Sequence, residues 1–322
     1  MNMVSEILFK LENISKDFPI KGGLLKRTIG NVKALDDVSL QLGHGKTLGL
    51  VGESGCGKTT IARIILHLEK PTSGNIIYNG NKTNVYTKNQ LKDYRKNVQM
   101  IFQDPYSSLN PQRNVNQILS EPFIIYKYNN IRTRISDILD LVNLPSSTLK
   151  KYPHELSGGL RQRLGIAKAL TLNPKMIVCD EPVSALDVSI RSQIINLLIE
   201  LQIKKNISYI FISHDLSLVE HISDNIAIMY LGQIVEYISS KNFKKNHLHP
   251  YTKALISSVP IIKPGIKKKR ILLQGEIPSA INPPIGCKFS TRCPEVMDIC
   301  ISKQPNYNKI NDDHFVSCHL IN

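Results

Sequence analysis

The residues from Leu48 to Thr60, LGLVGESGCGKTT, have the types and spacing of a loop that binds phosphate groups. An apolar run leads into closely spaced glycines, which allow the backbone to turn its N–H groups inward. Lys58 would place a cation at the β- and γ-phosphates, and the Thr59 hydroxyl can ligate Mg²⁺. A glycine-rich turn with a chance Lys-Thr is the alternative, but the strand-turn-helix background favours a nucleoside triphosphate. The loop residues are Gly52, Glu53, Ser54, Gly55, Cys56, Gly57, Lys58, Thr59 and Thr60.

Two adjacent carboxylates follow another apolar run, MIVCDEP, which extends from Met176 to Pro182. Asp180 can hold Mg²⁺ directly or through water, and Glu181 can orient and polarise an attacking water molecule. Adjacent acids after a strand are also common in turns that bind no metal. The phosphate loop upstream favours the catalytic interpretation.

The stretch HELSGGLRQR, from His154 to Arg163, predicts a second phosphate contact. Ser157, Gly158 and Gly159 precede a helix that we expect to begin near Leu160. A hydroxyl, close backbone N–H groups and the positive end of a helix dipole would then converge on one point. The alternative is that Ser-Gly-Gly simply caps the helix.

The elements that position these residues begin with strand patterns. Residues 7–18 and 32–42 alternate like strands, and the Gly-rich, basic residues between them predict a loop. Residues 60–70 have helical spacing after the phosphate loop, and residues 98–105 read as a strand. The first part of the chain therefore predicts an antiparallel start and a β-α unit around the phosphate loop.

Helical spacing dominates the next part, and strand-helix alternation then returns. Residues 111–170 show almost no strand signal, whereas the run around Asp180 and the residues that follow it alternate between strands and helices. The segment 225–238 predicts a hairpin around Gly232. From His249 the chain has little periodicity and is too short for a large core of its own. We therefore expect an α/β fold with an antiparallel β subdomain, a helical subdomain and a small cysteine-containing tail.

The overall composition bounds the class of protein. The 322 residues carry a net charge of +15, but the basic residues are spread along the chain, which indicates biased composition more than a nucleic-acid or lipid partner. The sequence has no apolar run of the roughly 18 residues that span a bilayer and no signal-peptide pattern. We expect a cytoplasmic protein unless a partner carries it to a membrane.

Four of the six cysteines crowd the tail with the spacing C-x5-C-x6-C-x17-C. In a reducing cytosol such clustering favours metal over disulfides. The paired C-x2-C spacing of zinc ribbons is missing, so spacing alone makes only a weak case for zinc, and thiols without metal remain an alternative. Cys56 and Cys179 are expected to be small buried side chains.

The ordered set of motifs resembles the ATPase subunit of an ABC transporter. It comprises the phosphate loop, LSGG, Asp180-Glu181, SALD ending at Asp187, and His214 after an apolar strand. The resemblance implies that Phe18 stacks on adenine, that Gln103 senses Mg²⁺ and the γ-phosphate, and that His214 contacts the γ-phosphate. It also implies that Thr59, Gln103 and Asp180 manage Mg²⁺ and that Ser157, Gly158, Gly159 and Asp187 act in trans on ATP held by a partner subunit.

Further stretches are similar to the oligopeptide/dipeptide importer ATPases, most closely to the F-type subunit of the oligopeptide system. These are IFQDPYSSLNP, CDEPVSALDVSI, LHPYTKAL and GEIPSAINPPIGCKFSTRCP. The resemblance implies a nucleotide-binding domain over 7–248, with a helical subdomain over about 105–170, and a C-terminal region over 249–322. Leu160 departs from the usual LSGGQ, but the contact-bearing serine and glycines are kept. Similar tails are associated with a [4Fe-4S] cluster, for which the ligands would be Cys287, Cys293, Cys300 and Cys318.

The predicted function is ATP hydrolysis that energises peptide import at the cytoplasmic face of the membrane. The implied partners are a second, D-type ATPase subunit, two permease subunits and an extracytoplasmic peptide-binding protein, with no nucleic acid. The solute is left open between oligopeptides, dipeptides and others, because the ATPase does not touch it. A soluble ABC ATPase acting on nucleic acid or the ribosome is the rival; it usually has two cassettes or a long coiled coil between the motifs. A degenerate regulatory subunit is disfavoured by Glu181 and His214.

Overall fold

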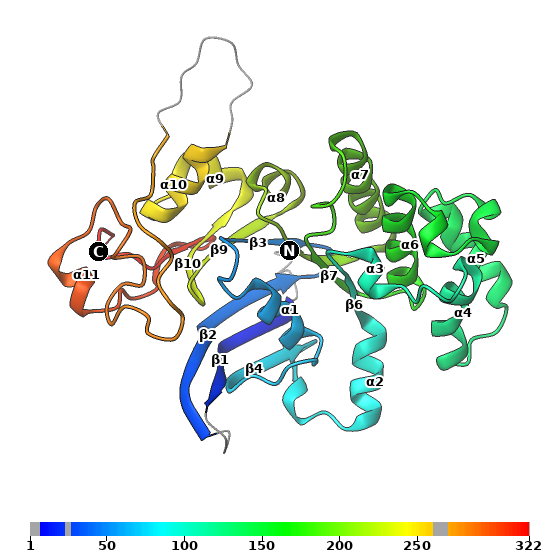
Figure 1. Cartoon of the computed structure of the whole chain (residues 1–322), viewed down its shortest axis with the longest axis horizontal. Helices are drawn as coiled ribbons and strands as arrows, with labels where there is room; N and C mark the ends of the chain where they lie inside the picture. The colour runs from blue at the N-terminus through cyan, green and yellow to red at the C-terminus, as the bar shows by residue number, and fades with distance from the viewer. Residues whose placement is uncertain (1–6, 23–26, 260–269, 322) are drawn as a thin grey trace, which may run out of the picture. The chain divides into compact units, whose positions relative to one another are not determined.

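The computed structural model describes residues 7–22, 27–259 and 270–321, and the chain divides into two compact units (Figure 1). The phosphate-loop unit comprises Ile7–Gln41, Leu48–Asn84 and Ser213–Asn322. The helical unit comprises Leu42–Thr47 and Val85–Ile212. No helix within the described ranges is both long and apolar enough to cross a membrane.

An antiparallel sheet opens the phosphate-loop unit. Its strands are β1 (Ile7–Gly22), β2 (Arg27–Gly43), β4 (Ser73–Tyr78) and β5 (Asn81–Lys82), in the order β2-β1-β4-β5. The loop predicted between residues 18 and 32 was too long, because both strands continue into it and only residues 23–26 lie outside the described part. Strand pairing overrides the weak intrinsic strand preference of Gly-rich, basic residues.

A second set of strands in the same unit carries the phosphate loop. β3 (Thr47–Val51) runs parallel to β9 (Asn225–Tyr230), and β9 pairs antiparallel with β10 (Gln233–Ser239). Leu231 and Gly232 join β9 to β10 with φ angles of 42° and 81°, the positive values that a tight hairpin turn requires. The predicted hairpin around Gly232 is confirmed.

Two short strands of the tail extend this sheet. The sequence analysis did not predict these strands. β12 (His314–Val316) pairs antiparallel with β10, and β11 (Asn308–Asn311) pairs with β12. The helices of the unit are η1 (Thr83–Val85, at its border), α1 (Lys58–Ile65), α8 (Leu216–Ile222), α9 (Ser240–Asn246), α10 (Pro250–Ser258) and α11 (Asp298–Ser302).

Helix α1 is shorter than the predicted 60–70. His67 has a left-handed φ of 52°, and the Leu68 N–H donates to the Arg63 carbonyl at 2.9 Å. A left-handed residue with a backbone bond reaching back over the last turn is the usual way in which a helix ends. The chain then turns before Pro71 and enters β4.

Three parallel strands form the sheet part of the helical unit, and the second and third are buried at every position. They are β6 (Val98–Ile101), β7 (Met176–Asp180) and β8 (Ser208–Ile212), with Met176 paired to Val98 and to Ser208. Near-continuous apolar sequence is what such strands require. Together with the antiparallel sheet and the helices, they confirm the predicted α/β class.

The helices of this unit include the predicted helical insert, drawn from cyan to green in Figure 1. Helix α6 begins at Gly158, two positions before the predicted start. The sequence analysis missed α2, although Thr87 and Gln90 form a capping box at its start. The helices are α2 (Lys88–Asn97), α3 (Pro105–Ser108), α4 (Val115–Ile125), α5 (Ile131–Leu141), η2 (Ser146–Lys150), η3 (Pro153–Glu155), α6 (Gly158–Leu170) and α7 (Val188–Lys205).

Candidate nucleotide site

The phosphate loop connects the buried strand β3 to helix α1. Gly57 precedes the helix with a φ of 110°, and a Cβ atom built there would lie 2.7 Å from the Ala34 carbonyl oxygen. A side chain at Gly52 would run into the Met229 carbonyl. Only glycine fits either position, so the loop backbone is packed tightly against β2 and β9.

Lys58 is held inside this loop. Its side chain is buried, with 7% of the residue exposed, and Nζ donates to the Gly52 carbonyl at 2.7 Å and to the Glu53 carbonyl at 2.9 Å. The Cys56 sulfur lies 3.6 Å from the same nitrogen. The loop therefore fixes one cation at the N-terminus of α1, where the helix dipole also favours an anion.

The other loop residues divide into a buried and an exposed set. Cys56 is buried, burial raises the pKa of its thiol, and its carbonyl accepts from the Gly232 N–H at 3.0 Å. Cys179 is fully buried in β7, so both cysteines are buried as predicted. The solvent-exposed loop positions are Ser54, Gly55 and Thr59, and Thr60 is half-buried.

The two predicted carboxylates lie at the end of β7. Asp180 is buried, and Glu181 has a left-handed φ of 45°, a backbone conformation that costs a non-glycine residue about 1 kcal/mol or more. The Glu181 N–H donates to the Ile212 carbonyl at 2.9 Å, and its carbonyl accepts from the Ser184 N–H and hydroxyl at 3.2 and 3.1 Å. Neighbouring backbone therefore enforces the strained conformation.

Gln103 meets Glu181 in the helical unit. The Gln103 Nε2 donates to the Glu181 Oε2 at 3.0 Å. Gln103 follows β6 and Glu181 follows β7, and these strands are parallel neighbours, so their carboxyl ends lie at one edge. An amide and a carboxylate at hydrogen-bonding distance can together orient a water molecule or a metal-bound water.

The Ser-Gly-Gly stretch begins helix α6 without a side-chain cap. Ser157 is the N-cap residue, but its exposed hydroxyl makes no capping hydrogen bond. Asp187, at the N-cap of α7, is likewise exposed and makes no side-chain cap. A Cβ at Gly159 would lie 3.0 Å from Ile190 Cγ2, so this glycine also permits close packing on α7.

The chain after Glu181 is held by an arginine that the sequence analysis missed. Arg191 Nε donates to the Leu186 carbonyl at 2.7 Å, and Nη2 donates to the Ser184 carbonyl at 3.2 Å. An arginine one turn into a helix is a weak sequence signal, since most such side chains face solvent. Here its two hydrogen bonds hold the backbone of the turn from Ser184 to Asp187.

Phe18 and His214 belong to the phosphate-loop unit. Phe18 is half-buried on β1, and Lys16 Nζ lies 4.7 Å from the centre of its ring. His214 is exposed and precedes α8, whose N-cap Asp215 accepts from the Ser217 and Leu218 N–H groups at 3.0 and 3.3 Å. The quadrupole of the ring attracts this cation to the ring face.

The tail cysteines are free thiols. The Cys287 N–H donates to the Cys300 carbonyl at 2.8 Å, and burial raises the pKa of Cys287 to about 11. Burial also raises the pKa of Cys293 and of Cys318. Without a metal ion, burial thus favours the neutral thiol at these three positions.

The predicted [4Fe-4S] site is not supported. Within the described ranges, no three or more His, Cys, Asp or Glu side chains are arranged to hold a metal ion. The prediction placed all four ligands at Cys287, Cys293, Cys300 and Cys318. In the structure the backbone hydrogen bond between Cys287 and Cys300 ties α11 to the segment before it.

Sequence reasoning also missed the residues of the tail that contact the phosphate loop. Arg292 donates to the Glu53 carboxylate from Nη1 at 2.7 Å and from Nη2 at 3.1 Å, and these hydrogen bonds raise the pKa of Arg292. The Tyr251 hydroxyl accepts from the Glu53 N–H at 3.1 Å. No spacing rule connects residues so far apart along the chain.

The chain matches two family models. Residues 35–184 match "ABC transporter", and residues 235–300 match "Oligopeptide/dipeptide transporter, C-terminal region". Among solved structures, the ATP-binding cassette MJ0796 bound to ADP and Pi, a dimer in a post-hydrolysis state, has a TM-score of 0.63 and 28% identity, covering 72% of this chain and 98% of that one.

Full-length relatives are more similar still. The oligopeptide transport ATP-binding protein AppF of Bacillus subtilis is 50% identical over 98% of both chains. The oligopeptide transport ATP-binding protein OppF of Escherichia coli is 45% identical over 99% of this chain and 98% of its own. The dipeptide transport ATP-binding protein DppF of Haemophilus influenzae is 44% identical over 96% and 95%. The chain therefore belongs to the ABC transporter ATP-binding proteins that carry the oligopeptide/dipeptide transporter C-terminal region.

Proposed function

We propose that this ATPase energises the import of oligopeptides or dipeptides across the cytoplasmic membrane. The observation that carries the proposal is the pairing, in one chain, of an ABC cassette with the C-terminal region named for oligopeptide and dipeptide transporters. The cassette accounts for ATP hydrolysis, and the C-terminal region narrows the class of transporter. The rival, a soluble ABC ATPase acting on nucleic acid or the ribosome, has no such support.

The phosphate loop is assigned the role of gripping ATP. Lys58 and the loop amides bind the β- and γ-phosphates, and Phe18 stacks on the adenine. The fit is supported by the glycine-only positions of the loop and by the buried ammonium at the start of α1. His214 steadies the γ-phosphate.

The two acidic residues at the C-terminal end of β7 are proposed to act in the hydrolytic step. Thr59, Gln103 and Asp180 would hold Mg²⁺, which would neutralise phosphate charge. Glu181 orients the attacking water and accepts its proton, and the Gln103–Glu181 hydrogen bond supports a shared role for these two side chains. The strained φ of Glu181 is consistent with a residue positioned for function at a cost in stability.

The proposed assembly has two ATPase subunits. Ser157, Gly158, Gly159 and Asp187 act on ATP held by the other subunit, which is supported by the exposed, uncapped side chains of Ser157 and Asp187. The other ATPase subunit is of the D type, and the remaining partners are two permease subunits and an extracytoplasmic peptide-binding protein. The chain itself is then peripheral to the membrane.

Reconstitution tests the proposal. The chain is co-purified with its membrane partners, placed in liposomes with the binding protein, and supplied with MgATP and radiolabelled di- to pentapeptides. Uptake should require ATP, disappear with Lys58→Ala and persist with Lys253→Ala, a surface lysine of the same unit. ATP-dependent uptake of a non-peptide solute alone, or co-purification with nucleic acid in place of membrane proteins, would contradict it.

A further inference from the structure

The segment from Cys287 to Cys293 presents two cations to the elements around the phosphate loop. Lys288 follows the first of these cysteines and Arg292 precedes the second, and their side chains are only 3% and 8% exposed. Burying a charge is costly unless it is paired. Each cation accordingly meets a carboxylate of a different element.

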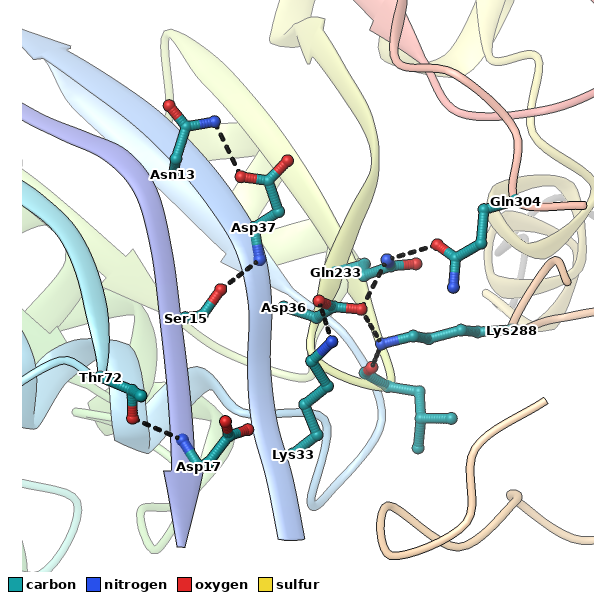
Figure 2. A network of polar contacts seen from close by, with 11 residues as sticks. Asn13, Ser15, Asp17, Lys33, Asp36, Asp37, Thr72, Gln233, Lys288 and Gln304 are labelled. Atoms are coloured by element: carbon teal, nitrogen blue, oxygen red, sulfur yellow. Dashed lines mark hydrogen bonds and ion pairs between the residues drawn. The ribbon is translucent and has the colours of Figure 1, made fainter. Parts of the chain in front are cut away.

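Lys288 reaches Asp36 on β2. Its Nζ lies 2.6 Å from the Asp36 carboxylate and donates to the Leu231 carbonyl at 3.3 Å (Figure 2). Lys33 and Gln233 approach the same carboxylate at 2.6 and 3.0 Å. Burial alone would raise the pKa of Asp36, but the hydrogen bonds from both lysines hold it below its usual value. This end of the segment is thereby fixed to β2 and to the β9–β10 turn.

Arg292 reaches the phosphate loop itself. Its two terminal nitrogens grip Glu53, while its Nε has no partner among the described residues. Such an end-on, two-point pair fixes the carboxylate in direction as well as in distance. The guanidinium also contacts Tyr230: Nη1 donates to its hydroxyl at 3.5 Å, and Cζ lies 5.9 Å from the centre of its ring. Phe289 packs edge-on against that ring at 5.2 Å.

Glu53 relays this contact to the cation of the loop. Its side chain binds Arg292, its N–H donates to the Tyr251 hydroxyl, and its carbonyl accepts from Lys58 Nζ at 2.9 Å. Every polar group of this residue is therefore engaged, with the C-terminal region on one side and with the phosphate-binding lysine on the other. A change in the position of Arg292 would therefore reach Lys58 through Glu53 alone.

We infer that Arg292 is a positioning residue that sets the affinity of the phosphate loop for ATP through Glu53. The C-terminal region is then part of the nucleotide machinery as well as a tail attached to it. This inference rests on the proposed role of the loop in binding ATP. Arg292 touches no reacting atom, so its effect is expected on nucleotide affinity more than on the hydrolytic step.

The test measures MgATP binding by titration calorimetry on the full chain and steady-state ATPase activity in the assembled transporter. Arg292→Ala should weaken binding about 10-fold, the scale of one hydrogen bond to a charged group, and raise KM with a smaller change in kcat. Arg292→Lys should recover part of the affinity, because one of the two contacts can re-form. Lys253→Ala removes the more exposed pair with Glu295 at 3.4 Å in the same region and should leave binding within twofold.

A compensating change separates positioning from general stability. Glu53→Gln added to Arg292→Ala should restore part of the binding, since the neutral amide that replaces the carboxylate needs no cation. If Arg292→Ala does not fold, Arg292→Lys and Tyr251→Phe replace it, and both should weaken binding while melting close to the parent protein. Wild-type affinity in the folded Arg292 variants, or a loss of the same size in Lys253→Ala, would overturn the inference.

Lys58→Ala distinguishes this inference from the proposed function. If Lys58→Ala keeps ATP affinity, the loop is not the site and the assignment of the loop fails. If Lys58→Ala loses binding while Arg292→Ala matches the parent, the loop assignment stands and only the positioning role fails.

Discussion

At the scale of single residues, two of the proposed functional residues are held in place by hydrogen bonds with neighbouring groups. Lys58 and Glu181 are both restrained by backbone groups, the first by two carbonyls of its own loop and the second by Ile212 and Ser184. Restraint of this kind fixes a group before the substrate arrives, which lowers the entropy cost of the reaction. Residues so held are the natural targets for conservative substitutions.

Replacing the Glu181 carboxylate by an amide tests the catalytic assignment. Glu181→Gln keeps the shape and the contact with Gln103 but removes the base that accepts a proton from water. We expect kcat of the assembled transporter to fall at least about 100-fold while MgATP affinity is unchanged. Steady-state hydrolysis and nucleotide titration measure the two quantities. Glu200→Gln, an exposed carboxylate on α7, is the matched control, and equal turnover in both variants would remove Glu181 from the mechanism.

At the scale of elements, one buried carboxylate joins β10 to β12 and to the start of α10. Glu236 on β10 is fully buried and binds His314 Nε2 on β12 at 2.8 Å, the Leu248 N–H at 2.7 Å and the His249 N–H at 3.1 Å. Burial would raise the pKa of Glu236, but these hydrogen bonds, led by the one to His314, lower it. β12 and the start of α10 thus depend on a single side chain.

Removal of this carboxylate should loosen the C-terminal region. Glu236→Ala leaves His314 and two backbone N–H groups without their partner, and we expect a loss of about 3–5 kcal/mol in the free energy of unfolding. Denaturant titration followed by circular dichroism measures it. Glu295→Ala, which removes only the partner of Lys253, should change the stability by less than about 1 kcal/mol. Similar stabilities for the two variants would mean that Glu236 does not hold the elements together.

Helix α10 makes the stability of the chain depend on pH through its cap. The fully buried His249 accepts from the Tyr251 N–H at 3.1 Å, which requires a neutral imidazole. Burial lowers its pKa to about 4, with Glu236 opposing and Lys253 adding to the shift. The unfolded chain, with an ordinary value near 6.5, binds more protons between these limits, so stability falls as the pH drops from about 6.5 to about 4.

The difference between these two pKa values corresponds to a loss of about 3 kcal/mol in the free energy of unfolding across that window. Unfolding midpoints measured at half-unit steps of pH test it. In His249→Asn the amide oxygen can still cap α10 but does not titrate, so this share of the pH dependence should vanish. His44→Asn, at an exposed position, should retain the full dependence, and the same slope in both variants would contradict the assignment.

Sequence patterns correctly predicted those helices, strands and turns that are determined by interactions between residues close together in the chain. The apolar runs of β7 and β8, the turn at Gly232 and the helical spacing of α5 are legible because burial and backbone geometry act within a few residues. The strands β11 and β12 were missed because three or four residues carry little periodicity and their pairing with β10 comes from distant sequence. The loop predicted after residue 18 was too long for the same reason. Its composition favours a turn, but pairing between strands extends β1 and β2 into it.

The candidate site shows the same division. Gly57, Lys58, Asp180 and Glu181 could be found because phosphate and metal chemistry fixes their types and spacing. The Arg292–Glu53 pair could not, because any of the 41 Lys and Arg residues could have met that glutamate. The cysteine spacing pointed to metal, but within the described residues no three His, Cys, Asp or Glu side chains have the arrangement that would hold a metal ion.

At the scale of the whole molecule, the nucleotide residues are distributed over both units of the chain. The phosphate loop, Phe18 and His214 belong to one unit, and Gln103, Asp180 and Glu181 belong to the other, together with the Ser-Gly-Gly stretch. Under the proposed function, hydrolysis therefore needs residues that belong to both units. The proposed action of Ser157 in trans extends this dependence to a second chain.

Without the D-type subunit, two copies of this chain would have to pair with each other. Isolated chains should therefore bind ATP as monomers and hydrolyse it only in such pairs. Turnover per molecule should rise with protein concentration, because ATP on one chain needs the Ser-Gly-Gly stretch of another. Lys58→Ala disables ATP binding by the phosphate loop, whereas Ser157→Arg disables the surface that contacts ATP on the partner chain. Each variant alone should therefore be inactive. Mixed in equal amounts, they form heterodimers with one intact site, and activity should return to about a quarter of the parent value by random pairing.

The informative comparison is a mixture of Lys58→Ala with Glu181→Gln. Both defects fall on the side of the site that holds the nucleotide, so neither site of the heterodimer is intact and the mixture should stay inactive. Recovery there would place Lys58 and Glu181 on ATP molecules bound by different chains. Turnover that is independent of concentration, with no recovery when Lys58→Ala meets Ser157→Arg, would show that one chain completes its own site and that Ser157 serves only to begin α6.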